Sequence, residues 1–104
     1  MHIDVVSDES IGRQARIYAE YRLFAALAPI AGARDLTGAS LLLHRGRRSR
    51  LGERVVCAVA IASKAGEVAR FTATGAHPYQ AINRAVERVR RTPWPGDLAR
   101  QASA

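Results

Sequence analysis

The chain has 104 residues, of which 16 are Lys or Arg and 9 are Asp or Glu, so its net charge at neutral pH is +7. This length fits one domain and leaves no room for two, and a hydrophobic fraction of 48% excludes a disordered chain. No apolar run approaches the roughly 18 residues that a membrane-spanning helix needs. We expect no signal peptide, because no basic and apolar regions follow Met1. The single cysteine, Cys57, excludes an internal disulfide, and we expect a reducing, cytoplasmic environment.

Residues 2–6 alternate weakly between polar and apolar side chains and predict a short first strand. From Ile11 to about Ala28 the apolar residues recur every three or four positions, which is typical of one face of a helix. Pro29 and Gly32 are expected to end that helix. The face that we expect in the core consists of Ile11, Ala15, Tyr18, Ala19, Leu23 and Ala26.

Three strands joined by short connections follow this helix. They are predicted over residues 39–44, 54–62 and 68–74, and alternation in the last strand indicates one buried and one hydrated sheet face. A second helix is predicted from Pro78, which suits a first helical turn, to about Arg91. Its apolar face consists of Tyr79, Ile82, Val86 and Val89.

The predicted order of elements is therefore β-α-β-β-β-α. Because each helix has an apolar stripe to bury, both must cover the same face of a sheet. We predict an α+β fold: a two-layer sandwich in which a four-stranded, mostly antiparallel sheet has two helices packed on one face. Residues 1–91 are expected to form this single domain, and residues 92–104 a flexible C-terminal tail.

Residue types that could carry catalysis are scattered along the chain. His2, His44 and His77 lack the spacing of metal ligands, so we expect no metal and no other cofactor. Cys57 lies within an apolar strand, where cysteine packs as a small hydrophobic residue. No Gly-Lys-Ser/Thr sequence follows the glycines of residues 46–52, so a Walker-type phosphate loop is excluded. We therefore expect that the protein is not an enzyme.

The positive charge is concentrated in two segments. Residues 41–60 have a net charge of +4 and residues 81–104 of +3, whereas residues 1–40 have −1. Fifteen of the sixteen basic residues are arginine, whose planar guanidinium suits phosphate. A polyanionic partner such as nucleic acid is one interpretation, and a solvated surface without a partner is the other. One face of the second helix collects Arg84, Arg88 and Arg91.

Several segments, taken in order, resemble one protein family. Residues 11–23 are similar to the pattern I-x-x-x-L-R-x-Y-V-x-x-K-L, with Ala15 in place of the usual Leu and Arg22 in place of the usual Lys. Residues 54–68 resemble the family's strand, turn and strand, and residues 75–86 its G-x-D-x-Y-x-A-I-D-x-x-V segment. The chain thus resembles the ribosome hibernation-promoting factor and ribosome-associated inhibitor family, also called sigma-54 modulation proteins, in its short, single-domain form.

This resemblance implies binding to the small ribosomal subunit, in the channel of messenger and transfer RNA, where the family blocks translation and stores idle ribosomes under stress. In such a site arginine would supply affinity by neutralising phosphates of ribosomal RNA. We predict this role for Arg84, Arg88 and Arg91. The basic positions of the family pattern add Arg16 and Arg22, and charge alone adds Arg45, Arg47, Arg48 and Arg50.

The first helix also has a second apolar stripe, roughly opposite the first, where the family usually has charge. An exposed stripe of large apolar side chains indicates a protein contact, either a homodimer through this helix or docking on a ribosomal or other protein. The alternative function is therefore a protein-interaction module that no longer binds ribosomes. The residues of this predicted protein interface are Ile17, Tyr21 and Phe24, followed by Ala28.

Overall fold

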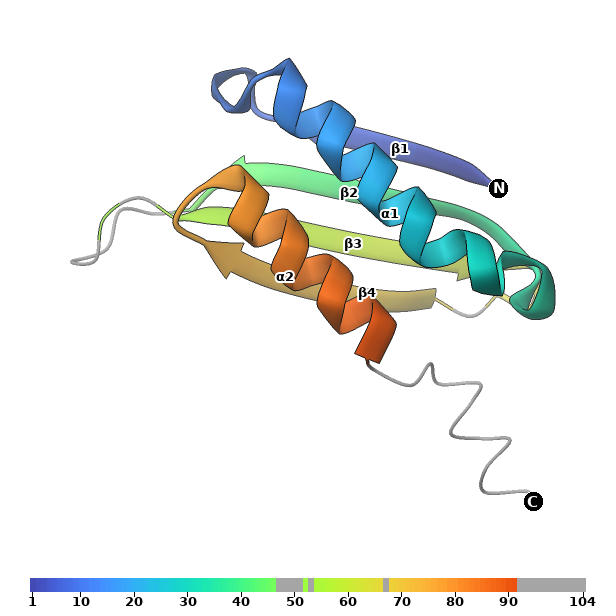
Figure 1. Ribbon diagram of the computed structural model, residues 1–104. Helices are drawn as coiled ribbons and strands as arrows, with labels where there is room; N and C mark the ends of the chain where they lie inside the picture. The colour runs from blue at the N-terminus through green and yellow to red at the C-terminus, as the bar shows by residue number, and fades with distance from the viewer. Residues whose placement is uncertain (47–51, 53, 67, 92–104) are drawn as a thin grey trace.

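In the computed structural model, four strands form one sheet and two helices cover one of its faces (Figure 1). The structure describes residues 1–46, 52, 54–66 and 68–91, so the predicted tail lies outside the described residues. The β-α-β-β-β-α order and the α+β class are as predicted. The elements are β1 (His2–Ser7), the short 3-10 helix η1 (Glu9–Ile11), α1 (Arg13–Arg34), β2 (Leu36–Arg45), β3 (Val55–Ser63), β4 (Val68–Gly75) and α2 (Pro78–Arg91).

The strands lie in the sheet in their order along the chain, β1-β2-β3-β4. β1 runs parallel to β2, with Val5 opposite Leu41, and α1 forms the crossover between them. The β2–β3 and β3–β4 pairs are antiparallel. α1 packs over β1 and β2 whereas α2 packs over β3 and β4, so the opposite sheet face remains open (Figure 1). None of the helices in the described part of the chain is both long and apolar enough to span a membrane.

The core lies between the helices and the covered face of the sheet. In β3, every second residue from Val55 to Ile61 points into it, as the period of two of a strand requires. On the open face Val6 and Leu42, which pair across β1 and β2, are exposed. The largest fully buried side chains are Leu23, Leu27, Leu41, Leu43, Ile61, Ile82, Val55, Val59, Val86 and Cys57.

The prediction that Pro29 ends the first helix is wrong, since α1 continues to Arg34. Proline removes one backbone donor and disturbs the carbonyl of residue 25, but Pro29 is exposed and water can hydrate that carbonyl. Leu27 is fully buried and Ile30 packs against the core, so burial on both sides of the proline holds the helix together. The helix is instead capped by Asp35. Its backbone is left-handed, with φ 51°, and its N–H donates to the carbonyls of Ala31 and Gly32 in the last turn.

Tyr79 is not part of the core, contrary to the prediction, because 41% of it is exposed. The face that α2 buries is shifted toward two alanines, Ala81 and Ala85, whose small size lets the helix lie close to the sheet. This shift leaves Tyr79 at the boundary between the helices. There its ring meets Tyr18 edge-on, with centroids 5.1 Å apart.

Candidate nucleic-acid interface

The position of α2 depends on a glycine at the end of β4. A Cβ built on Gly75 would lie 2.6 Å from the backbone nitrogen of Ala81 and 3.0 Å from the Cβ of Gln80. The Gln80 side chain also accepts a hydrogen bond of 2.7 Å from the Ala76 N–H. The first turn of α2 therefore lies directly against the strand that precedes it, which aligns the helix along β4, an edge strand of the sheet.

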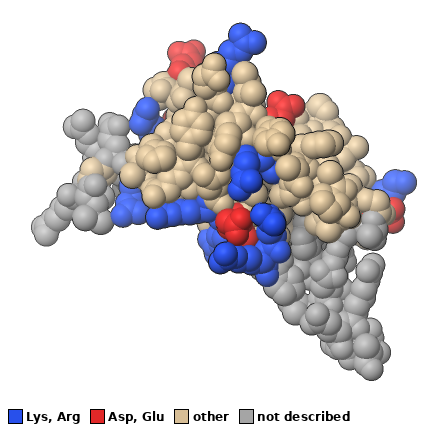
Figure 2. Space-filling view, in the orientation of Figure 1, with Lys and Arg blue, Asp and Glu red and all other residues tan. Residues whose placement is uncertain are grey.

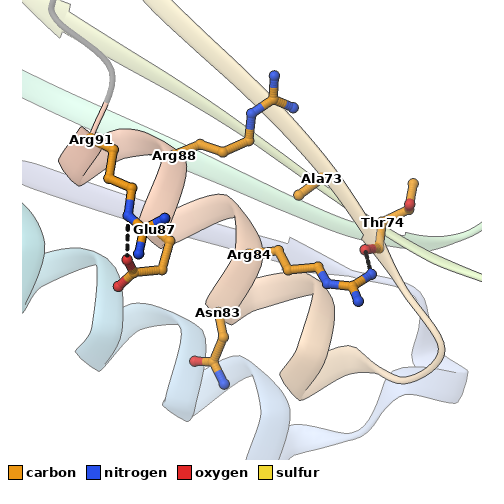
Figure 3. Close-up of a pocket in the computed structure, with 7 residues that line it drawn as sticks. All are labelled: Ala73, Thr74, Asn83, Arg84, Glu87, Arg88 and Arg91. Atoms are coloured by element: carbon orange, nitrogen blue, oxygen red, sulfur yellow. Dashed lines mark hydrogen bonds and ion pairs between the residues drawn. The ribbon is translucent and has the colours of Figure 1, made fainter.

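This alignment brings the three predicted arginines of α2 to one groove. Arg84, Arg88 and Arg91 lie four and three residues apart, so they share one side of the helix, and all three are exposed. The groove runs between α2 and β4 and has a volume of about 670 Å³ (Figure 3). Its lining consists of Ala73, Thr74, Asn83, Arg84, Glu87, Arg88 and Arg91.

Two of these arginines are held by the backbone of the edge strand. The Nη1 of Arg84 donates to the Thr74 carbonyl at 3.0 Å, and Nη1 of Arg88 donates to the Thr72 carbonyl (Figure 3 draws the first bond). Each guanidinium has five N–H donors, so several donors on each group remain for a ligand. The bonds to β4 reduce the conformational freedom that these long side chains would otherwise lose on binding an anion.

Glu87 lies among these arginines and was missed by the sequence analysis. Its carboxylate accepts from Arg91 Nε at 3.2 Å and from Arg90 Nη1 at 3.4 Å. The spacings of three and four residues on a helix could have identified both pairs. Exposed ion pairs of this kind contribute at most about 1 kcal/mol to stability, so a phosphate can compete with the Glu87 carboxylate for these arginines. With four arginines and one glutamate, this part of α2 keeps a net charge of +3.

Arg22 lies on the side of α1 that faces α2. One turn before it, the Tyr18 hydroxyl donates to Asn83 Oδ1 at 2.5 Å, which fixes this side of α1 against α2. Arg22 is half-buried, and its Nε is buried without a hydrogen-bond partner among the described residues. A buried, unsatisfied donor is costly, so Arg22 is available to an acceptor that reaches the boundary between the helices.

The other predicted arginines are not brought to this groove. Arg16 is exposed on the β1 side of α1, where it lines a smaller groove with Val5 and Glu20. Arg45 ends β2, and its Nε donates to the Ser10 hydroxyl at 2.9 Å, so it ties the connection between β1 and α1 to the sheet. The remaining predicted positions, Arg47, Arg48 and Arg50, lie outside the described residues.

The row of arginines on α2 and the exposed apolar stripe lie on different helices. Figure 2 shows Lys and Arg gathered over α2 and the adjoining sheet edge, whereas most of the surface along α1 is neither basic nor acidic. The second apolar stripe of α1 is exposed to 52% at Ile17, 69% at Tyr21 and 55% at Phe24. A binding partner that contacts the arginines of the α2 groove therefore leaves most of this stripe uncovered.

The residue types that the sequence analysis considered for metal binding and catalysis can be compared with the structure. No three His, Cys, Asp or Glu side chains among them lie close enough to hold a metal ion. Burial raises the pKa of the Cys57 thiol to about 12, so the thiol remains protonated at neutral pH and is a poor nucleophile. The chemistry that the α2 groove provides is that of arginine donors arranged along a solvent-exposed channel.

Comparisons with known proteins agree with this fold. The sequence matches no family model and no curated protein. The structure is similar to that of a ribosomal subunit interface protein from Coxiella burnetii, with a TM-score of 0.69 and 12% identity over the full length of both chains. The chain thus has the fold of a ribosomal subunit interface protein, in agreement with the resemblance of its sequence to the hibernation-promoting factors.

Proposed function

We propose that this protein is a ribosome-associated translation inhibitor. In this proposal it binds ribosomal RNA of the small subunit in the channel of messenger and transfer RNA, and it acts by occupation rather than catalysis. The observation that carries the proposal is the row of Arg84, Arg88 and Arg91 along one groove, with two guanidiniums already ordered by β4. The fold shared with a ribosomal subunit interface protein supports it. A protein with this function acts in the cytoplasm, during the conditions in which ribosomes are stored.

The electrostatics of the α2 groove set the expected strength of the salt effect. Each phosphate neutralised on single-stranded RNA contributes about 0.7 to the slope of log K against log salt concentration. Three arginines would therefore give a slope of about −2, and Arg22 would add to it. Shape and phosphate contacts of this kind place a protein on RNA without reading its sequence.

Co-sedimentation with purified small ribosomal subunits at low and high salt tests the proposal. The wild type should bind at low salt and dissociate as salt rises, and Arg84→Glu/Arg88→Glu should not bind. The matched control is Arg13→Glu/Arg70→Glu, which makes the same change of charge at two exposed arginines outside the α2 groove. This control should keep most of the binding and the inhibition of a purified translation system. A wild type that does not bind even at low salt contradicts the proposal.

The exposed stripe on α1 favours a second candidate function, a protein-interaction module whose arginines only maintain solubility. Its binding would depend on Phe24 and the neighbouring apolar side chains, and it would change little with salt. Phe24→Glu and Arg88→Glu therefore separate the two functions. Loss of partner binding in the first variant alone, at any salt concentration, would support the interaction module.

A further inference from the structure

The two edges of the sheet differ in how they are protected. At the β4 edge, Arg84 and Arg88 donate to the carbonyls of Thr74 and Thr72. β1, at the other edge, pairs with β2 alone among the described strands. Within the described residues no side chain is hydrogen-bonded to the β1 backbone. The one charged residue of the strand, Asp4, is paired with His2 of the same strand at 3.0 Å, and the strand contains no proline, lysine or arginine. These are the features that normally prevent an edge strand from pairing with another chain.

The exposed apolar stripe of α1 lies directly beside this unprotected edge. Ile17, Tyr21 and Phe24, with Glu20 between them, line a groove of about 570 Å³ together with Met1 and the first two residues of β1. One side of this groove is thus formed mainly by large apolar side chains, and the other by a strand that, among the described strands, pairs on one side only. A single partner that covers both must supply a strand and an apolar helix in the same relative positions.

We propose that this partner is a second copy of the chain, in a symmetric dimer. A two-fold axis perpendicular to the sheet would place β1 antiparallel to β1 of the partner subunit and form one eight-stranded sheet. The same axis keeps the helices of both copies on one sheet face and brings their α1 helices together. One operation then covers both the strand edge and the apolar stripe.

Charge selects the register of the paired strands. Directly opposite residues of antiparallel strands point to the same face, so a symmetric pair must be centred on a residue. Centring on Asp4 would place two carboxylates opposite each other, which is destabilising, and centring on Val5 would place Asp4 opposite the partner's apolar Val6. Centring on Ile3 instead places His2 opposite Asp4 of the partner subunit, and Met1 opposite the partner's Val5. Within each strand His2 Nε2 already lies 3.0 Å from Asp4 Oδ1, so this second register brings two such pairs together on the open face and gives an apolar pair on the helix face.

The spacing of the helices agrees with this arrangement. Because α1 packs over β1 and β2, its axis lies roughly one strand spacing of about 4.8 Å from the two-fold axis. The two α1 helices would therefore be about 10 Å apart, close to the 8–10 Å of packed helices. Ile3 lines the same groove as these residues of α1, and it is also the residue on which the second register is centred. In the antiparallel crossing, Ile17 of one copy faces Phe24 of the partner subunit.

This dimer leaves the α2 grooves free. They lie at the two outer ends of the sheet, whose terminal strands are roughly 34 Å apart at seven strand spacings. Dimer formation and the proposed RNA binding therefore depend on different residues, and either can fail without the other.

The first test is the mass in solution, measured by light scattering across a wide range of protein concentrations. The wild type should reach twice the protomer mass of 11.3 kDa, and Phe24→Glu should remain at the protomer mass with an unchanged circular dichroism spectrum. Arg90→Glu, which introduces the same side chain at an exposed position of α2 whose arginine pairs with Glu87 rather than with β4, should dimerise like the wild type. A wild type at the protomer mass at every concentration overturns the proposal. If Phe24→Glu then also weakens binding to small subunits, the stripe docks on the ribosome instead.

The second test is cross-linking across the two-fold axis. Ile3→Cys should form a disulfide-linked dimer under mild oxidation, because the two side chains would face each other across the axis. Val6→Cys is the matched control on the same strand, exposed to 59% but without an opposite residue in this register, and it should stay monomeric on a denaturing gel. The buried Cys57 does not interfere. Cross-linking of Val6→Cys but not of Ile3→Cys would refute the β1 register.

Discussion

Replacing Gly75 with alanine should destabilise the protein, whereas the same substitution at Gly32 should stabilise it. A Cβ at residue 75 meets backbone atoms of α2, at 2.6 Å from Ala81 N and 3.1 Å from Gln80 C, and these atoms can only move with the helix. Forcing extra atoms into such a contact costs about 1–3 kcal/mol. Gly32 lies within α1, and nothing lies within 4 Å of the position of its Cβ. Alanine at residue 32 should stabilise the protein by about 0.5–1 kcal/mol.

Thermal unfolding followed by circular dichroism measures both effects. At this size each kcal/mol shifts Tm by about 4–8 °C, so a cost of about 2 kcal/mol would lower the Tm of Gly75→Ala by roughly 8–16 °C. Gly32→Ala should raise Tm by about 2–8 °C. A Gly75→Ala protein as stable as the wild type would refute the reasoning, because α2 could then move away from β4 at no cost. Below its Tm, this variant should also bind small subunits more weakly, since the displaced helix carries the arginines.

The remaining predictions concern α1 and the core. Pro29→Ala should raise the free energy of unfolding in urea by about 1–3 kcal/mol, because proline is about 3 kcal/mol less favourable than alanine inside a helix but also restricts the unfolded chain. Tyr18→Phe should lower the free energy of unfolding by about 1 kcal/mol in the same assay, since Asn83 loses its hydrogen bond from the tyrosine hydroxyl. The wild type should lose more stability than Cys57→Ala as pH rises from 9 toward 12, because the pKa of the buried thiol is raised from 9.0 to about 12 and only the unfolded chain ionises. The difference in the free energy of unfolding between the two proteins should grow by about 1.4 kcal/mol per pH unit, as measured by urea unfolding at each pH.

Alternation and helical spacing were sufficient to predict the layers of this fold. In β4 the apolar residues Ala69, Phe71 and Ala73 alternate with polar ones, and the structure buries this apolar face, as the alternation indicated. The end of the first helix could not be predicted in this way. Proline usually ends a helix. At Pro29 the helix continues because Leu27 and Ile30 are packed into the core, and this packing depends on the sheet beneath them.

The candidate site was predictable as a stripe but not as a groove. The spacing of Arg84, Arg88 and Arg91 placed them on one side of a helix, as the structure has them. Nothing in the sequence showed that the carbonyls of β4 hold two of them, because that contact depends on which strand lies beside α2. For the same reason the sequence could not show that Arg45 is held by the residues that precede α1.

The bonds from Arg84 and Arg88 to β4 link protection of the sheet edge to the proposed binding of RNA. An edge strand presents carbonyls that attract other strands, and here guanidinium groups satisfy two of them. Lysine could supply the charge, but its single ammonium lacks the planar fork that lets one side chain bond a carbonyl and still offer paired donors to phosphate. The predominance of arginine in this chain is therefore useful at this edge for a physical reason. At the β1 edge no such donors are present among the described residues, and strand pairing remains open to a second copy of the chain.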